Sequence, residues 1–301
     1  MRRARASGGK QRQPGEIRAV AVHGQTIRHR PHADPPFTWQ IGDAARLAKA
    51  TGIDVAWDFR TADVAVGGSG APLVPLFDYL TLRSDRVSRA VVNIGGIANI
   101  TVLPRRCRIE EVSAFDTGPG NMVIDALMAR YYDRPFDRGG AVARRGRILP
   151  AAIRAMLAHP YFSQRPPKST GREAFGAAFV SALVRAGRGA PPEDLVATAT
   201  EFTALSIYQQ YLAFVHKRTP IDELLVCGGG VKNDALMEAL RSYFDRIPVR
   251  PTQSAGVSPE AKEAVCFALL ARETVLGRPG NIPGATGAAR RTVLGTIALP
   301  E

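Results

Sequence analysis

One acidic side chain stands at a point in the sequence where it could do chemistry. Residues 116–121 read Asp-Thr-Gly-Pro-Gly-Asn and separate a strand-like run from a helical pattern. A carboxylate at the end of a strand can accept a proton or hold a hard cation such as Mg²⁺. Gly118 and Gly120 would let the backbone approach an anion at the start of the helix. The alternative is that Asp116 only caps the helix or the turn.

A second glycine-bearing segment reads Asn-Ile-Gly-Gly-Ile-Ala-Asn over residues 93–99. Gly95 and Gly96 separate two strand-like runs, 89–94 and 97–103, which predicts a β-hairpin. Without side chains at the turn, backbone N–H groups can come close to phosphate oxygens. A plain tight turn is the alternative.

A third segment, residues 227–233, reads Cys-Gly-Gly-Gly-Val-Lys-Asn and follows a short apolar run. Its flat backbone could carry a purine ring, although a glycine turn into a helix starting near Asn233 explains it as well. The chain has no Gly-x-x-x-x-Gly-Lys-Ser/Thr motif, and no Gly-x-Gly-x-x-Gly motif at a first βα turn, so the P-loop and Rossmann interpretations are weak.

Hydrogen-bonding side chains follow other strand-like runs and suggest a substrate side. His23 and Gln25 could hold a sugar or a carboxylate, and Arg60 could bind a carboxylate with two parallel hydrogen bonds. Anchoring of the local loop is the alternative for each. His29 and His32 lie in a proline-bearing segment that we expect to be a solvated loop rather than a metal site.

The elements that position these residues alternate between strands and helices, which indicates an α/β fold, and the predicted hairpin makes the sheet mixed. Residues 168–173 read Lys-Ser-Thr-Gly-Arg-Glu and resemble an anion loop, but the spacing of Thr170 and Glu173 is also that of a capping box. We expect strands at 17–22, 53–56 and 224–227 and helices from Asp43 to Gly52, after Asp116, and near 148–158, 172–186, 193–215 and 259–276.

Composition limits the classes of protein that remain. The chain has 301 residues, of which 45% are hydrophobic, and its apolar runs are far shorter than the roughly 20 residues of a membrane-spanning helix. Its three cysteines are far apart, which favours a reducing cytoplasm over disulfides or zinc. The net charge of +13 would suit polyanions. The arginines are scattered, however, so we do not expect nucleic-acid binding.

Taken together and in order, these segments resemble the 1,6-anhydro-N-acetylmuramic acid kinase family, bacterial cell-wall recycling enzymes of the actin-like, Hsp70 and sugar-kinase superfamily. The resemblance runs from about Ile17 to the C-terminus. It rests on the motifs at residues 23–26, 40–43, 58–60, 67–75, 93–99, 116–121, 167–173, 227–230 and 279–283.

The resemblance implies an actin-like fold of two RNase-H-like domains with ATP between them. It assigns Asp116 as the base that deprotonates a water and Glu263 as a second carboxylate near the substrate. The water attacks the anomeric carbon, the 1,6-anhydro ether opens, and the released O6 takes the γ-phosphoryl group. Mg²⁺ would bridge phosphate oxygens.

The same resemblance implies the remaining site residues and the organisation of the chain. The substrate is a small amino sugar, the compartment is the cytoplasm, and a homodimer is suggested. We expect a disordered basic leader at 1–16, a first domain at 17–88 with the substrate residues, and a second domain at 89–301. The implied ATP-binding residues are Asn93, Gly95, Gly96, Gly118, Gly120, Asn121, Gly228, Gly229, Gly230 and Asn233.

One departure from the family pattern concerns the start of the chain. Family members begin with a strand that leads into a Gly-Thr-Ser-Leu-Asp-Gly phosphate loop, and this chain has the arginine-rich residues 1–16 instead. We therefore expect a truncated first domain. Three readings follow: a kinase whose start lies upstream, an inactive or merely sugar-binding remnant of that kinase, and a basic protein that associates with nucleic acid.

Overall fold

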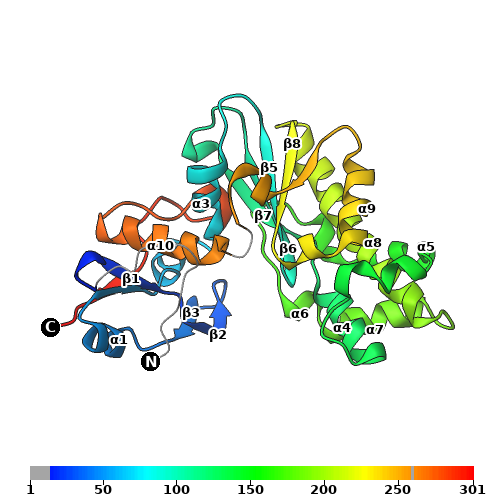
Figure 1. Ribbon diagram of the computed structural model, residues 1–301, viewed down its shortest axis with the longest axis horizontal. Helices are drawn as coiled ribbons and strands as arrows, with labels where there is room; N and C mark the ends of the chain where they lie inside the picture. Colours follow the sequence, from blue (N-terminus) through cyan, green and yellow to red (C-terminus); the bar gives the residue numbers. More distant parts are fainter. Residues whose placement is uncertain (1–13, 259–260) are drawn as a thin grey trace.

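The computed structural model describes residues 14–258 and 261–301. Two β-sheets form the centres of two lobes, the first on the left and the second on the right of Figure 1. Of the expected basic leader, residues 1–13 lie outside the described residues, and Pro14–Glu16 form one turn of 3-10 helix. Residues 259–260 of the expected last helix also lie outside them.

The first lobe is built on a three-stranded sheet in the order β1-β4-β10. Strand β1 (Ala19–Val22) pairs in parallel with β4 (Asp54–Trp57), and β10 (Thr296–Ala298) pairs antiparallel with β4. The division into two domains between residues 88 and 89 stays a prediction. However, β10, near the end of the chain, belongs to the same sheet as β1, near its start. No local pattern in three residues indicates such a pairing.

Helix α1 (Ala44–Thr51) leads into β4 and has the predicted ends. The side chain of Asp43 accepts a hydrogen bond from the backbone of Arg46, which caps the first turn. Gly52 ends the helix in the left-handed conformation, with φ of 68°. Both signals are local, which is why the sequence indicated them correctly.

A two-stranded ribbon, β2 (Gln25–Arg30) and β3 (Phe37–Ile41), extends from the first lobe toward the second (Figure 1). The sequence analysis placed His29 in a solvated loop, which is wrong: His29 lies in β2, and its Nδ1 is 2.8 Å from the hydroxyl oxygen of Thr38 on β3. Only the turn between the strands contains the prolines, and these concealed the two short strands on either side.

The second lobe is built on a five-stranded sheet in the order β7-β6-β5-β8-β9. Strands β5 (Arg89–Ile94) and β6 (Ile97–Leu103) form the predicted hairpin. Strand β8 (Glu223–Cys227) pairs in parallel with β5, and β9 (Val249–Pro251) pairs in parallel with β8. Because the hairpin strands are antiparallel, the prediction of an α/β fold with mixed sheets is confirmed. Strand β7 (Ser113–Pro119) continues past Phe115, where it was expected to end, because it still pairs with β6.

Helices cover both faces of this sheet. One face packs against α8 (Pro192–Tyr211) and α9 (Asp234–Phe244), and the other packs against α3 (Val74–Leu82) and α10 (Lys262–Val275). The other helices are α2 (Thr61–Ala65), α4 (Met122–Tyr132), α5 (Pro150–Leu157), α6 (Arg172–Phe175), α7 (Ala177–Ala186) and α11 (Pro283–Thr286).

Two expected helices are interrupted. The helix expected at 172–186 is split into α6 and α7 at Gly176, whose ψ of −144° is not helical. The helix expected at 193–215 is α-helical to Tyr211 and continues as a π-helical turn, Leu212–His216. The described part of the chain has no helix with both the length and the apolar character of a membrane span.

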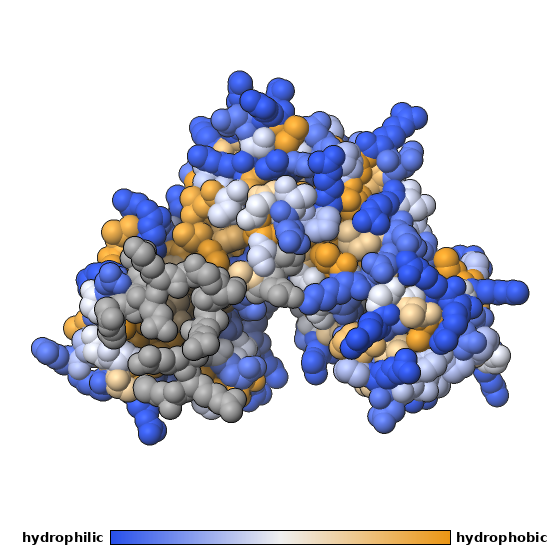
Figure 2. Space-filling view, viewed as in Figure 1, coloured by the Kyte–Doolittle hydropathy of each residue, from blue (hydrophilic) through white to orange (hydrophobic). Residues whose placement is uncertain are grey.

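The two lobes share a hydrophobic core. A single cluster of buried side chains includes Ala56 and Phe59 from the first lobe together with Val91 and Leu225 from the second sheet. Below the lobes, the surface is hollowed between them (Figure 2). The shared core therefore joins the two lobes and holds the two sides of this cleft in place; we call it the joint.

A buried ion pair lies in this joint. The ammonium of Lys262 on α10 is 2.6 Å from a carboxylate oxygen of Asp78 on α3, with 6% and 2% of the two side chains exposed. The same ammonium donates a hydrogen bond to the sulfur of Cys227 at the end of β8. Burial alone would raise the pKa of Asp78, and the charge of Lys262 acts against this rise.

We expect Lys262→Met to lower the free energy of unfolding by about 3–5 kcal/mol, because it leaves the Asp78 carboxylate buried without a counter-charge. The double variant Asp78→Leu, Lys262→Met should recover most of this loss. Chemical denaturation measures both. Lys217→Met, at an exposed lysine, is the matched control and should change the stability by less than about 0.5 kcal/mol. A double variant no more stable than Lys262→Met would contradict the prediction.

Candidate functional site

Asp116 lies in the middle of β7, rather than at the strand end where the sequence placed it, because the strand continues to Pro119; the residue is 9% exposed. One carboxylate oxygen accepts a hydrogen bond of 2.8 Å from the backbone N–H of Thr170. Burial raises the pKa of Asp116 to about 7, although the Thr170 hydrogen bond favours the ionised form. A carboxylate that titrates near neutral pH is suited to general-base work.

The turn of the predicted hairpin packs against the start of α4. The carbonyl of Gly95 accepts a hydrogen bond from the N–H of Asn121, and the carbonyl of Gly96 accepts from those of Gly120 and Met122. The approach is so close that a Cβ on Gly120 would lie 2.3 Å from the carbonyl oxygen of Gly95. These N–H groups at the start of α4, expected to face an anion, are therefore bound within the protein.

The glycine segment after β8 lies against the same hairpin. Gly228 has φ of 82°, and a Cβ there would be 2.6 Å from the Ile94 carbonyl oxygen. Gly230 packs against the Ile94 side chain, where a Cβ would come within 2.5 Å. Close packing of the two loops thus explains both glycines, and Gly229 lies beside the amide of Asn121.

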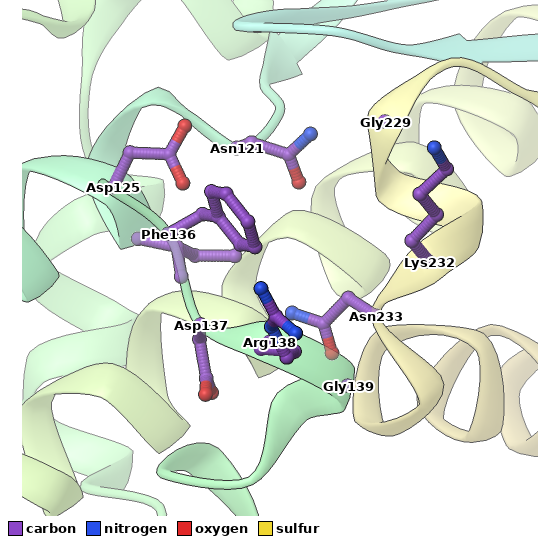
Figure 3. Close-up of a pocket in the computed structure, with 10 residues that line it drawn as sticks. Asn121, Asp125, Phe136, Asp137, Arg138, Gly139, Gly229, Lys232 and Asn233 are labelled. Carbon is purple, nitrogen blue, oxygen red and sulfur yellow. The ribbon is translucent and has the colours of Figure 1, made fainter. Parts of the chain in front are cut away.

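A cavity of about 540 Å³ opens beside these loops (Figure 3). It brings together three residues that the sequence analysis proposed for ATP, namely Asn121, Gly229 and Asn233. The amide of Asn121 donates to the carbonyl of Ile94, and the side chain of Asn233 caps α9 by accepting from the backbone of Leu236. Both side chains are therefore held in place by the protein.

The other side chains that line this cavity were not among the predicted site residues: Ile124, Asp125, Phe136, Asp137, Arg138 and Lys232. In Figure 3 the ring of Phe136 projects between Asn121 and Arg138, with Lys232 and Asn233 on the opposite side. Phe136 is 50% exposed. The only signal in the sequence that could have pointed to Phe136 is that it lies in a segment without hydrophobic periodicity.

Other predicted nucleotide residues lie outside that cavity. Gly96 lines a second cavity of about 610 Å³, together with Arg130 and Arg172. Asp125 lines both cavities, and burial raises its pKa to about 6. Asn93 is behind the loops, where its amide oxygen is 3.7 Å from the Cys227 sulfur. Gly118 is in β7, where a Cβ would lie 2.9 Å from the ring of Phe162.

His23 and Arg60 form one cluster in the first lobe. The guanidinium of Arg60 donates to the Nε2 of His23 at 2.7 Å and to the carbonyl of Gly70 at 2.7 Å. The Nδ1 of His23 is 2.8 Å from the carbonyl of Gly24. Burial and the Arg60 charge lower the pKa of His23, so a neutral ring that donates from Nδ1 and accepts at Nε2 fits all these contacts.

Glu263, in the first turn of α10, belongs to this cluster. Burial lowers the pKa values of His23 and Arg60, and the Glu263 charge opposes this lowering. The charged groups that shift the pKa of Asp116 are instead Glu173 and Lys168. Burial and the Arg60 charge lower the pKa of His29 on the ribbon of the first lobe, and the Glu173 charge opposes this lowering, so Glu173 acts on both lobes. Sequence reasoning did not assign Glu173 to the site.

Gln25, the last of the predicted substrate residues, makes no hydrogen bond with His23 or Arg60 among the described residues. Gln25 is exposed at the start of β2, and its amide makes a long hydrogen bond of 3.4 Å to the carbonyl of Thr26. Within the part of the chain that the structure describes, no group of three or more His, Cys, Asp or Glu side chains could hold a metal ion.

The family model for anhydro-N-acetylmuramic acid kinase matches residues 5–300. The chain belongs to this family. It is 48% identical to the anhydro-N-acetylmuramic acid kinase of Salinibacter ruber over 95% of this chain and 74% of that protein. The proteins of that name from Xanthomonas campestris and Gloeobacter violaceus are 46% and 45% identical over 94% of this chain and 73% and 75% of theirs.

Two solved structures show a distant likeness to this chain. A xylulose kinase from Lactobacillus acidophilus is 13% identical over 87% of this chain and 51% of its own, with a TM-score of 0.41. The activator of 2-hydroxyisocaproyl-CoA dehydratase from Clostridium difficile, with bound ADPNP, is 15% identical over 68% and 67%, with a TM-score of 0.40. Likeness at this level carries no argument about function.

The family expected from the sequence motifs is thus confirmed. The match begins at residue 5 rather than at Ile17, so part of the supposed leader belongs to the family domain. The expectation of a truncated first domain is not borne out, and no comparison favours the inactive remnant. The roles of the individual site residues remain predictions.

We expect Asp116→Asn to stabilise the protein above neutral pH. Because the folded-state pKa of about 7 exceeds the ordinary 3.8, ionisation favours the unfolded chain, and wild-type stability falls as the pH rises from 3.8 to about 7. The variant should gain up to about 4 kcal/mol at pH 8 and progressively less toward pH 4. Denaturation curves at several pH values measure this. Asp85→Asn, at an exposed site, should show no such trend, and a gain independent of pH would contradict the prediction.

Proposed function

We propose that this chain is an ATP-dependent sugar kinase that opens 1,6-anhydro-N-acetylmuramic acid hydrolytically and phosphorylates it to N-acetylmuramic acid 6-phosphate. The observation that carries the proposal is the Asp116 carboxylate, nearly buried and with a pKa of about 7, in a chain of this kinase family. We also propose that the enzyme works in the cytoplasm, in cell-wall recycling, and that it forms a homodimer.

Asp116 would act on the attacking water. Its carboxylate takes one proton from the water while the water oxygen bonds to the anomeric carbon. The bond between that carbon and O6 breaks, and its electron pair stays on O6. O6 then bonds to the γ-phosphorus, ADP leaves, and the proton on Asp116 returns to solvent. The single carboxylate thus supplies general-base catalysis, which contributes roughly 10²–10⁴-fold in rate.

The cavity beside the hairpin is the proposed site of ATP. Its volume of about 540 Å³ is in the range of ligand pockets. The half-exposed ring of Phe136 offers a stacking surface for adenine, while Arg138 and Lys232 supply positive charge at the wall. Asp125 is a lining carboxylate that fits Mg²⁺, which prefers oxygen ligands, whereas the carboxylate of Asp137 already accepts hydrogen bonds from two backbone N–H groups. When bound to the phosphates, Mg²⁺ would neutralise charge that develops during transfer.

The first lobe supplies the proposed sugar side. Arg60 uses its guanidinium to hold the His23 ring and the Gly70 carbonyl, so it would position neighbouring groups as well as meet the substrate. Glu263 lies in this cluster and would contact the sugar from the side opposite Asp116. Gln25 is exposed at the start of the ribbon, from which it would bind a hydroxyl group.

Removal of the base should stop the reaction without removing ATP. In Asp116→Asn we expect turnover to fall by about 10³-fold or more, because the amide cannot accept the proton of the water. ATP affinity should stay within about twofold. Mass spectrometry of the sugar product and calorimetric titration with ATP measure the two effects. Asp85→Asn should retain full turnover, and near-normal turnover of Asp116→Asn would refute the proposed mechanism.

Loss of the stacking surface should weaken ATP binding selectively. We expect Phe136→Ala to raise the KM for ATP by about 5- to 100-fold, since stacking of a base on an aromatic ring contributes about 1–3 kcal/mol. The KM for the sugar should not change, and Phe136→Trp should restore ATP binding. Ile148→Ala, which removes another exposed apolar side chain, is the control. An unchanged KM for ATP would place the adenine elsewhere.

A further inference from the structure

A buried lysine lies behind the Asp116 carboxylate. Lys168 is 8% exposed, whereas lysines are almost never buried unless they are paired. Its ammonium donates to the side-chain oxygen of Gln210 at 2.7 Å and to the carbonyl of Tyr161 at 3.1 Å. It also lies over the rings of Tyr161 and Phe214, at 4.4 and 5.0 Å from their centres.

All the direct partners of this ammonium are neutral. Among the described residues, no carboxylate lies within ion-pair distance of Lys168, so the positive charge is not cancelled by a direct salt bridge. Burying a charge without a counter-charge is costly. A neutral residue such as methionine would fill the same space without that cost, so packing alone does not explain a lysine at this position.

The same residues hold the backbone of Asp116. The N–H of Asp116 donates to the carbonyl of Lys168 at 3.1 Å, and the hydroxyl of Tyr161 donates to the carbonyl of Asp116 at 2.6 Å. Gln210 on α8 completes the arrangement by donating to the carbonyl of Phe162 at 3.2 Å. Lys168, Tyr161 and Gln210 therefore form one hydrogen-bonded network that is joined to the backbone of Asp116.

We propose that Lys168 is a positioning residue for Asp116: its uncancelled ammonium charge favours the ionised carboxylate, while the hydrogen bonds of Lys168 and Tyr161 to the Asp116 backbone fix the place of that residue. The inference rests on the proposed role of Asp116 as the base. The lysine itself touches neither substrate nor water. It acts through the field of its charge, which is strong where water is excluded.

The groups around Asp116 act in opposite directions. Lys168 and the N–H of Thr170 lower its pKa, whereas burial and the exposed Glu173 on α6 raise it. On the neighbouring strand β6, the residue opposite Asp116 is the uncharged Asn99, and α8 contributes the uncharged Gln210. Burial lowers the pKa of Lys168 itself to about 8, so the ammonium keeps its charge at neutral pH.

The test is the pH dependence of kcat/KM for the kinase reaction. The acid limb of the profile reports the ionisation of the base. In Lys168→Met, which keeps the length of the side chain but not its charge, this limb should move to higher pH by about one unit. In Glu173→Gln it should move to lower pH. Lys217→Met is the control and should leave the profile unchanged, because Lys217 is exposed.

A second variant guards against loss of folding. If Lys168→Met unfolds, Gln210→Leu removes the side-chain acceptor of the ammonium, and a shift of the limb to higher pH in this variant is the expected result. A uniform loss of rate with an unmoved limb, in whichever of the two variants folds, overturns the inference. If Asp116→Asn is inactive and the limb does not move, only the role of Lys168 fails. If Asp116→Asn is active, the proposed function itself fails.

Discussion

The pairing of β7 with β6 as far as Pro119 is the constraint on which the site depends. Because the strands remain paired through Gly118, Asp116 is fixed in a sheet rather than carried on a loop. The same pairing brings the hairpin turn against the start of α4, where two glycine carbonyls bind the first N–H groups of the helix. Asp116, the hairpin and one wall of the cavity are therefore one rigid unit.

This arrangement has an electrostatic consequence. A carboxylate buried beside the sheet would normally become neutral, and burial does raise the pKa of Asp116. The Thr170 N–H and the Lys168 charge oppose that effect, while Glu173 adds to it. The balance leaves an acid that titrates near neutral pH, in the range where a general base is effective. Burial of this carboxylate lowers the stability of the folded protein above neutral pH, and such a loss of stability is common at functional sites.

Several parts of this arrangement were predictable from the sequence. The Gly95–Gly96 hairpin, the caps of α1 and the strand before the glycines at 228–230 are local signals, and the structure confirms them. The ribbon was missed because each of its strands is short and the prolines lie between them. The full length of β7 was missed because a Pro-Gly pair resembles a turn when its pairing partner is not known.

The sequence by itself determined the family, the α/β class and the position of Asp116 at a strand, because motif order, capping and glycine turns are encoded by neighbouring residues. Only the tertiary structure decided what surrounds that carboxylate. Lys168, Gln210 and Glu173 come from separate segments, Glu263 lies with His23 and Arg60 in the first lobe, and Phe136 projects into the cavity. Burial and charge depend on contacts between segments far apart in the chain, and these have no local signature.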